Sequence, residues 1–243
     1  MKRIFCLLLL LLAACGGGSK KGFRVGIDPN WYPVEFGSQQ SYVNGFTEEV
    51  LLEISRYTGI EFEKMTANWD TILDGLKTKK YDAIISSLLP YGYNQAKYDF
   101  SPPLLQIGPV WIVPGDHKKA PSKVKGALVG LIEGDATALI LEKYPTLIQR
   151  NYSSIPDLLN GIVTGEVQGA ILAGIPATSY VRDLYAGKLK IIGRPLDDSG
   201  LRFIVLKGEN KQAFNAFNKA LQRMQKKKQL QALLEKWQLK TAS

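Results

Sequence analysis

The sequence predicts an α/β protein made of two similar lobes. Three features of its 243 residues support this prediction. Strand patterns alternate with helix patterns along the body of the chain, and this alternation restarts after Pro114. In addition, the segment ILDGLKT at residues 72–78 returns as LLNGIVT at residues 158–164, an offset of 86 positions. Such a repeat indicates two copies of one helix-to-strand unit.

The first half of the body predicts a parallel sheet with helices. Residues 23–28 have a strand pattern, and apolar residues at helical spacing predict a helix over residues 46–57 that Gly59 ends. Residues 61–65 predict a short strand, and Asp70 is the expected N-cap of a helix that runs to Lys77. Residues 81–86 form a nearly continuous apolar strand, which is typical of a buried parallel sheet.

The second half predicts the same order of elements. Residues 127–132 predict a strand and a helix to about Lys143, followed by a strand near Arg150 and a helix around Leu158. A strand over residues 167–172 and a helix around Tyr180 come next. We expect the chain to cross between the lobes near residues 111–113 and near residues 191–193. One lobe should then contain residues 23–112 and 195–243, and the other residues 113–194.

The C-terminal segment carries most of the excess positive charge. The net charge is +9, and residues 211–243 hold eight basic residues and one acidic residue, whereas residues 4–210 hold 21 of each. The excess is thus local, which argues against binding to nucleic acid. Apolar residues at helical spacing from Phe214 to Trp237 predict a packed amphipathic helix pair with a solvated basic face. Attraction of that face to an anionic membrane, or to a partner in the membrane, is the alternative.

The N-terminus has the layout of a secretory signal. Lys2 and Arg3 precede an apolar stretch of 12 residues that ends at Cys15, shorter than the roughly 20 residues that span a bilayer. The ending LAAC resembles the bacterial lipobox, which implies a signal peptide over residues 1–14 and acylation of Cys15. Cleavage near Ala14 without a lipid is the alternative. Residues 15–22 would be a tether, and the protein would lie on the periplasmic side of a bacterial membrane, held there by lipid.

Residue counts exclude several kinds of site. The only histidine, His117, lies in a polar run with the pattern of a linker, so no Ser-His-Asp or Cys-His device is predicted. Cys6 leaves with the signal peptide and Cys15 is used by lipid, so we expect no disulfide and no metal site. The chain has no phosphate-binding loop of the Gly-x-x-x-x-Gly-Lys-Ser/Thr type. ATP hydrolysis would therefore belong to a partner, and no cofactor is expected.

Motifs along the body resemble family 3 of the bacterial solute-binding proteins, the polar amino acid receptors of ABC importers. DPNWYPVEF at residues 28–36 resembles the family's opening motif, and NGFTEE at residues 44–49 its next element. NWD at residues 68–70, YDAIIS at residues 81–86 and YDFS at residues 98–101 resemble further signatures, and KLKIIG at residues 188–193 and EKW at residues 235–237 the closing segments. The resemblance spans residues 22–239.

The resemblance implies a type II periplasmic-binding-protein fold, in which two lobes joined by two hinge crossings close like a flytrap. It implies a monomeric binding protein, not an enzyme, that captures a small polar solute and delivers it to the permease and ATPase subunits of an ABC importer. The solute would resemble an amino acid, an amine or a short peptide.

Two other function classes remain open on this scaffold. One is a lipoprotein that keeps the fold for sensing or adhesion without transport. The other is an enzyme resembling the cyclohexadienyl dehydratases, in which acids such as Asp28 and Asp135 would transfer protons. A permease gene beside this one would favour the importer, turnover of an offered substrate would favour the enzyme, and a chain that never closes would favour the sensing or adhesion protein.

The resemblance also implies ligand-binding residues, several of which depart from the family. The arginine that clamps the ligand carboxylate in the family is Asn94 here, and the aspartate that holds the amino group is Gly174. The usual Gly-Thr of the second lobe is Gly134-Asp135, and Trp31 is the implied aromatic floor. The candidates are Asp28, Asn30, Trp31, Tyr32, Ser86, Ser87, Leu88, Leu89, Asn94, Gly134, Asp135, Ala136 and Gly174.

These departures disfavour a free amino acid in the family's usual pose, because its carboxylate would be buried without a cation. Misalignment around residues 90–93 is the alternative, but no arginine lies between Arg56 and Arg150. Asp135 is expected either to cap the following helix or to face the cleft. In the cleft, Asp135 and Asp28 would together favour an ammonium group on the solute.

Overall fold

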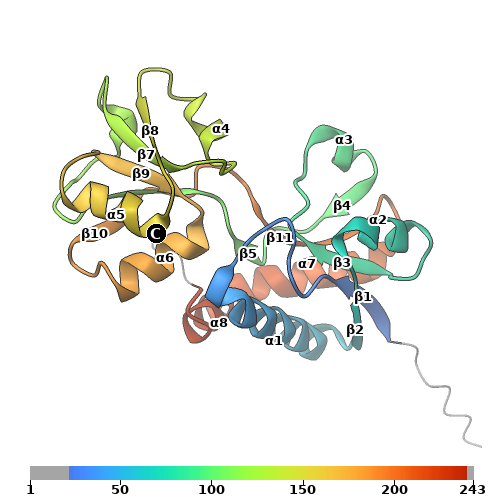
Figure 1. Ribbon diagram of the computed structural model, residues 1–243. Coiled ribbons are helices and arrows are strands. Elements are labelled where there is room, and N and C mark those ends of the chain that lie inside the picture. Colours follow the sequence, from blue (N-terminus) through green and yellow to red (C-terminus); the bar gives the residue numbers. More distant parts are fainter. Residues whose placement is uncertain (1–21, 240–243) are drawn as a thin grey trace, which may run out of the picture.

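The protein folds into two α/β lobes that lie side by side, which confirms the predicted fold class (Figure 1). The computed structural model describes residues 22–239. We call residues 22–106 and 200–239 lobe one and residues 110–192 lobe two, because each set contributes to a separate sheet. The predicted signal peptide, Cys15 and the predicted tether up to residue 21 lie outside the described residues.

The sheet of lobe one draws strands from both ends of the described chain. It contains β1 (Phe23–Ile27), β2 (Phe62–Thr66), β3 (Ala83–Ser86), β4 (Tyr98–Phe100), β5 (Leu105–Gln106) and β11 (Gly200–Leu206). The order is β2-β1-β3-β11-β4, and β5 also pairs with β11. β1 is parallel to β2 and β3, whereas β11 is antiparallel to β3, β4 and β5. The returning chain therefore completes the sheet.

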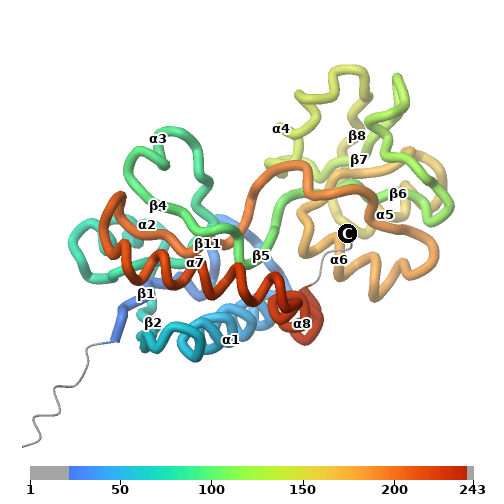
Figure 2. Tube along the Cα trace, turned by 180° about the vertical axis from the view of Figure 1, so that it is seen from behind, coloured from blue at the N-terminus to red at the C-terminus, as the bar shows by residue number. Residues whose placement is uncertain are grey.

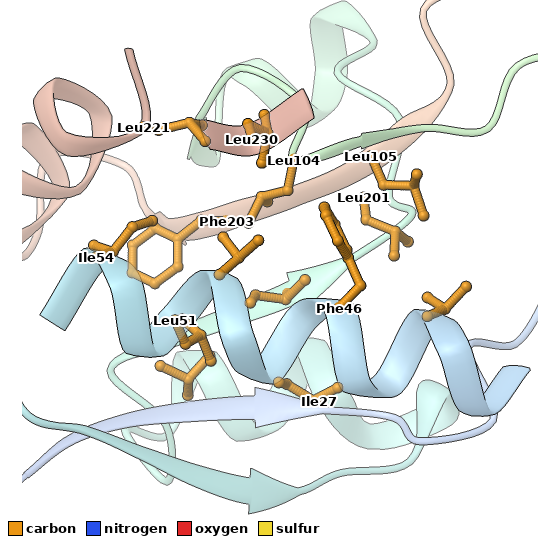
Figure 3. Close-up of a cluster of buried hydrophobic side chains, with 14 of the residues drawn as sticks. Ile27, Phe46, Leu51, Ile54, Leu104, Leu105, Leu201, Phe203, Leu221 and Leu230 are labelled. Atoms are coloured by element: carbon orange, nitrogen blue, oxygen red, sulfur yellow. The ribbon is translucent and has the colours of Figure 1, made fainter. Parts of the chain in front are cut away.

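Helices cover both faces of this sheet. Lobe one contains η1 (Gly37–Gln39), α1 (Gln40–Thr58), α2 (Trp69–Lys77), α3 (Gly92–Gln95), α7 (Lys211–Lys226) and α8 (Gln229–Lys236). Between the sheet and α1 and α7 lies the larger apolar cluster, in which Phe46 and Ile54 of α1 point toward Leu201 and Phe203 of β11 (Figure 3). The rings of Phe203 and Phe217 stack with centroids 4.0 Å apart. Burying this much apolar surface is the main stabilising contribution to the lobe.

Lobe two has a five-stranded sheet of the order β10-β6-β9-β7-β8. Its strands are β6 (Val110–Pro114), β7 (Leu128–Ile132), β8 (Ile148–Tyr152), β9 (Gly169–Leu172) and β10 (Leu189–Ile192). Its helices are η2 (Pro121–Lys123), α4 (Ala138–Leu141), α5 (Ile155–Val163) and α6 (Gly174–Asp183). The helix expected to run to about Lys143 is the single turn of α4, which begins at Ala138 after its N-cap Thr137, because Gly134 has a left-handed φ of 75° that ends any helix before it.

The internal repeat is confirmed down to individual hydrogen bonds. α2 and α5 each have nine residues and begin after side-chain N-caps, Asn68 and Ser154. The carbonyl oxygens of Gly75 and Gly161 each accept a hydrogen bond from the amide five residues later. β3 and β9 follow, and each lies between one parallel and one antiparallel strand. The two units are therefore copies in structure as well as in sequence.

Two local predictions need correction. Asn68, not Asp70, is the N-cap of α2, since the amide of Asp70 donates to Asn68 Oδ1 at 2.9 Å. The segments expected to be crossings, near residues 111–113 and 191–193, belong mostly to β6 and β10, which pair with each other. The chain instead crosses at residues 107–109 and 193–199. The predicted boundary between residues 112 and 113 therefore cuts β6, whose pairing places the whole strand in lobe two.

α7 and α8 form the packed amphipathic pair that the apolar spacing predicts. Phe217, Leu221, Met224 and Leu230 are buried in the apolar cluster of lobe one. α7 crosses the back of lobe one (Figure 2), and its lysines are exposed. In residues 22–239, no helix combines the length and the apolar character needed to cross a membrane. The same residues contain no group of three histidine, cysteine or acidic side chains placed to hold a metal ion.

Candidate functional site

Several of the predicted site residues lie at the carboxyl ends of parallel strands in both lobes. Asp28 follows β1 and Ser86 ends β3, and these strands are parallel neighbours. Gly134 lies just beyond β7, and Gly174 lies just beyond β9, which is parallel to β7. Ligands of open α/β sheets bind at such strand ends. The structure therefore places Asp28 and Ser86 at one end of the lobe-one sheet, and Gly134 and Gly174 at one end of the lobe-two sheet.

The carboxylate of Asp28 fixes the loop that follows β1. The residue is 6% exposed. Its Oδ1 accepts a hydrogen bond from the amide of Asn30 at 2.9 Å, and its Oδ2 accepts one from the amide of Trp69 at 3.1 Å. Each carboxylate oxygen has a second acceptor position. Asp28 thus joins the first loop to the start of α2 and can still accept further hydrogen bonds.

The aromatic residues of the first loop differ in exposure. Trp31 is 2% exposed and belongs to the apolar cluster of lobe one, and its Nε1 donates to Asn44 Oδ1 at 2.7 Å. This corrects the expectation that Trp31 forms an aromatic floor. Tyr32 is 60% exposed, and its ring lies edge-on to that of Trp69, with centroids 6.2 Å apart. Trp69 is a further candidate that the sequence analysis did not name, although it lies within the NWD motif.

The segment after β3 is organised by its own side chains. Ser86 Oγ accepts a hydrogen bond from the amide of Leu88 at 3.2 Å. Asn94 is 7% exposed, and its Nδ2 donates to the carbonyl oxygen of Leu89 at 2.8 Å. Ser87, Leu88 and Leu89 are half-buried. Asn94 therefore closes the loop over residues 89–94. This hydrogen bond uses an amide hydrogen that would otherwise be available to a ligand carboxylate.

In lobe two, the side chain of Asp135 forms a hydrogen bond within its own loop, whereas the N-cap of α4 is Thr137, which makes no side-chain capping bond within residues 22–239. The Oδ1 of Asp135 accepts a hydrogen bond from the amide of Thr137 at 2.7 Å, just before α4. Gly134 has a φ of 75° in the left-handed region, which favours glycine, and Ala136 is exposed. Gly174 is buried at the start of α6, and its carbonyl oxygen accepts a hydrogen bond from Thr178.

The lobes touch beside Gly174 and not beside Asp135. Ile175 is 2% exposed and packs in the apolar cluster of lobe one. Arg182, near the end of α6, donates from Nη1 to the carbonyl oxygen of Gln238 at 3.0 Å. Within residues 22–239, no hydrogen bond or ion pair joins residues 134–136 to lobe one, and α4 stands apart from α3 in both views (Figures 1 and 2). The structure therefore leaves this part of lobe two separate from the lobe-one candidates.

Arg202 of β11 is a second residue that we did not predict. Ile27, Ile85 and Phe203 form one row of paired residues across β1, β3 and β11, and all three face the larger apolar cluster. Side chains alternate along a strand, so the next row faces the other side of the sheet. That row consists of Asp28, Ser86 and Arg202, with Arg202 paired to Ser86. An arginine within the apolar run of residues 201–206 is the sequence signal that identifies it.

Cavities in the described part of the chain do not all coincide with these residues. A cavity of about 560 Å³ lies at the opposite ends of the strands, beside Phe23, Arg24 and Asp82. A more open depression is lined by Asp28, Asn30 and other residues at the carboxyl end of β1 and the start of α2. We base the site on the strand ends and the charged row, because size alone does not identify a binding site.

The family model of the bacterial extracellular solute-binding proteins, family 3, matches residues 23–240. The match includes both lobes and both crossings. The L-cystine-binding protein of Escherichia coli strain K12 is 25% identical over 219 residues, which cover 88% of this chain and 81% of that protein. The arginine-binding extracellular protein of Bacillus subtilis is 24% identical over 226 residues, which cover 90% of this chain and 86% of that protein. The histidine-binding periplasmic protein of Salmonella typhimurium is 24% identical over 211 residues, covering 83% and 81%.

Solved structures show the same fold. The L-cystine solute receptor of Neisseria gonorrhoeae, in its unliganded open conformation, has a TM-score of 0.72 at 20% identity and covers 89% of this chain and 92% of its own. The second substrate-binding domain of a putative amino acid ABC transporter from Streptococcus pneumoniae has a TM-score of 0.67 at 21% identity. The match covers 90% of this chain and 100% of that domain. At these identities the likeness concerns the fold alone.

Proposed function

The chain belongs to the bacterial extracellular solute-binding proteins of family 3, and from this premise we propose that it is the amino-acid-binding component of an ABC importer. The observation that carries the proposal is the family match across both lobes. The names of three relatives, which specify cystine, arginine and histidine, support an amino acid as the solute. Such a protein binds and releases its solute without changing it chemically.

Solute capture would depend on closure of the two lobes. A solute held between the strand ends of lobe one and those of lobe two has its full set of contacts only when the lobes approach each other. Residues 107–109 and 193–199 are the two connections between the sheets, so they would absorb the hinge motion. The closed form would then dock on permease and ATPase subunits, since the sequence has no phosphate-binding loop of its own.

The test of solute binding is a thermal-shift screen of the chain from residue 22 onwards against the common amino acids, including L-cystine, L-arginine and L-histidine. A ligand at 100 times its dissociation constant stabilises the native state by about 2.7 kcal/mol. For a protein of this size we expect the melting temperature to rise by about 5–10 °C, with compaction in small-angle scattering. A flat response to all amino acids would contradict the proposal and favour the sensing or adhesion alternative.

We also propose that Cys15 carries the lipid anchor on the periplasmic side of a bacterial membrane. Two or more acyl chains hold a protein on a bilayer more firmly than one. The test is Cys15→Ser in cells, which should release the protein into the soluble fraction or leave uncleaved precursor. If the variant still partitions wholly with membranes, acylation at Cys15 is not the anchor.

A further inference from the structure

We propose that Arg202 supplies the cation that binds the carboxylate of the solute, and that this carboxylate replaces Asp198 on the guanidinium. The inference rests on the proposed function in one respect, namely that the solute is an amino acid. It answers a problem raised by the site itself. A buried carboxylate needs a cation or several hydrogen-bond donors, and Asn94 is neutral and already donates to Leu89.

Arg202 is the only buried cation among residues 22–239, and Asp28 is the only buried anion. Both belong to the row at the carboxyl ends of β1 and β3, with Ser86 between them. β1 and β11 are separated by one strand, so the backbone positions of Asp28 and Arg202 are about 10 Å apart across the sheet at the usual strand spacing. A zwitterion is the class of solute that matches such a row, with its ammonium group toward Asp28 and its carboxylate toward Arg202.

The hydrogen bonds of Arg202 leave part of its guanidinium unused. Nη1 donates to the carbonyl oxygen of Ser101 at 3.0 Å, and Nη2 donates to the carbonyl oxygen of Asp198 at 2.9 Å. Nη2 also pairs with the Asp198 carboxylate at 2.5 Å. Nε is buried and has no hydrogen-bond partner among residues 22–239. An arginine presents its donors as a planar fork that suits a carboxylate, so a buried donor without an acceptor indicates capacity for a further one.

The ion pair with Asp198 shows that this guanidinium can bind a carboxylate. The side chain of Asp198 is 67% exposed, whereas that of Arg202 is 6% exposed. An exposed carboxylate gains little from an ion pair, because water solvates it well when the pair is broken. A solute carboxylate can therefore take its place. Asp198 lies in the crossing at residues 193–199. Its displacement from Arg202 would therefore break a contact that holds this crossing to lobe one. Solute binding would in this way be coupled to closure of the lobes.

The experiment compares amino acids with the amines that lack their carboxylate. Calorimetry on the chain from residue 22 onwards would use L-arginine with agmatine, L-histidine with histamine, and L-cystine with cystamine. We expect the bound amino acid to bind at least about tenfold more tightly than its amine, as for a charge-assisted hydrogen bond. Asp198→Asn should tighten amino acid binding by about two- to fivefold and leave amine binding unchanged. Glu209→Gln, an equal charge change beyond the other end of β11, is the control.

Arg202→Gln should weaken binding of the amino acid by about tenfold or more, so that its affinity equals that of the amine. Because Arg202 is buried, its variant can fail to fold, which circular dichroism would reveal. Asp198→Asn then decides the question by itself. Equal affinities for amino acid and amine in the unmodified protein, or an amino acid affinity that Asp198→Asn leaves unchanged, would overturn the inference while the proposed function stands. Binding of no amino acid at all would overturn both.

Discussion

Polar side chains at the candidate site first serve the backbone around them. Asp28, Ser86, Asn94 and Asp135 each accept or donate a hydrogen bond within or beside their own loop. Buried polar groups of this kind are satisfied because an unpaired one is costly. The strand-end loops are thereby held in place before any solute arrives, which lowers the entropic cost of binding.

Asp28→Asn tests this role at a single residue. The amide group of asparagine would turn one acceptor oxygen into a donor, so one of the amides of Asn30 and Trp69 would lose its partner. We expect the free energy of unfolding to fall by about 1–3 kcal/mol, measured by urea denaturation without solute. Asp70→Asn, at an exposed position in the first turn of α2, should change it by less than about 0.5 kcal/mol. Equal losses in the two variants would show that the buried bonds of Asp28 contribute nothing.

Close packing between α1 and α8 sets a steric limit at one glycine. A Cβ atom added to Gly45 would lie 2.2 Å from the ring of Trp237, a distance that real contacts do not reach. Gly45→Ala should therefore displace the ring and α8, at a cost of about 1–3 kcal/mol. Tryptophan fluorescence and thermal melting would measure the change. Ser41→Ala, at an exposed position of the same helix, is the control and should leave both signals as they are.

Glu49 joins the same two helices through its charge. The hydrogen bond from Lys236 lowers the pKa of Glu49 below its usual 4.5; burial acts in the opposite direction, and a hydrogen bond from Trp237 adds to the lowering. Because the folded-state pKa is lowered, the stabilising contribution is complete above the unfolded pKa and is lost as the pH falls through the folded value.

The melting temperature should reflect this linkage. We expect Glu49→Gln to melt below the unmodified protein above about pH 5.5, with the difference in melting temperature narrowing as the pH falls below about 5. Glu48→Gln is a matched control, because Glu48 is 54% exposed and its pair with Lys64 lies on the surface. A gap for Glu49→Gln that stays constant down to pH 3 would contradict this linkage.

The whole molecule has an uneven surface charge. Lys226, Lys227 and Lys228 are exposed at the end of α7, and no ion pair involving them occurs among residues 22–239. α7 itself contains no acidic residue. Its basic face is solvated, as the sequence predicts, and the membrane alternative remains open to measurement.

Sedimentation with phosphatidylglycerol vesicles tests that alternative. Each lysine near an anionic surface contributes about 1 kcal/mol, so changing all three to glutamine should weaken vesicle binding about 100-fold or more. Binding should also fall as salt is raised. Changing Lys118, Lys119 and Lys123 of lobe two to glutamine removes the same charge elsewhere. If both triple variants lose binding alike, net charge and not the α7 face is responsible.

The sequence by itself determined the α/β class, the repeat and the positions of most helices and strands. These features depend on local periodicity and capping, which a short stretch of chain contains in full. The order of the motifs also identified the family, and the two strands predicted to end at Asp28 and Ser86 match β1 and β3, which end at Ile27 and Ser86. Local patterns could not distinguish β6 and β10 from crossings, because both are short apolar segments whose pairing partners lie far away in the sequence.

Only the tertiary structure decided what individual site residues contact. Trp31 is buried in the core, and the Asn94 amide donates a hydrogen bond within its own loop. Arg202 lies in the row with Asp28 and Ser86. Arg202 donates to Ser101, which is 101 residues away along the chain. Such neighbours arise from sheet pairing between distant segments, whose register is specified jointly by both strands and by the cluster beneath them. No local pattern contains that information.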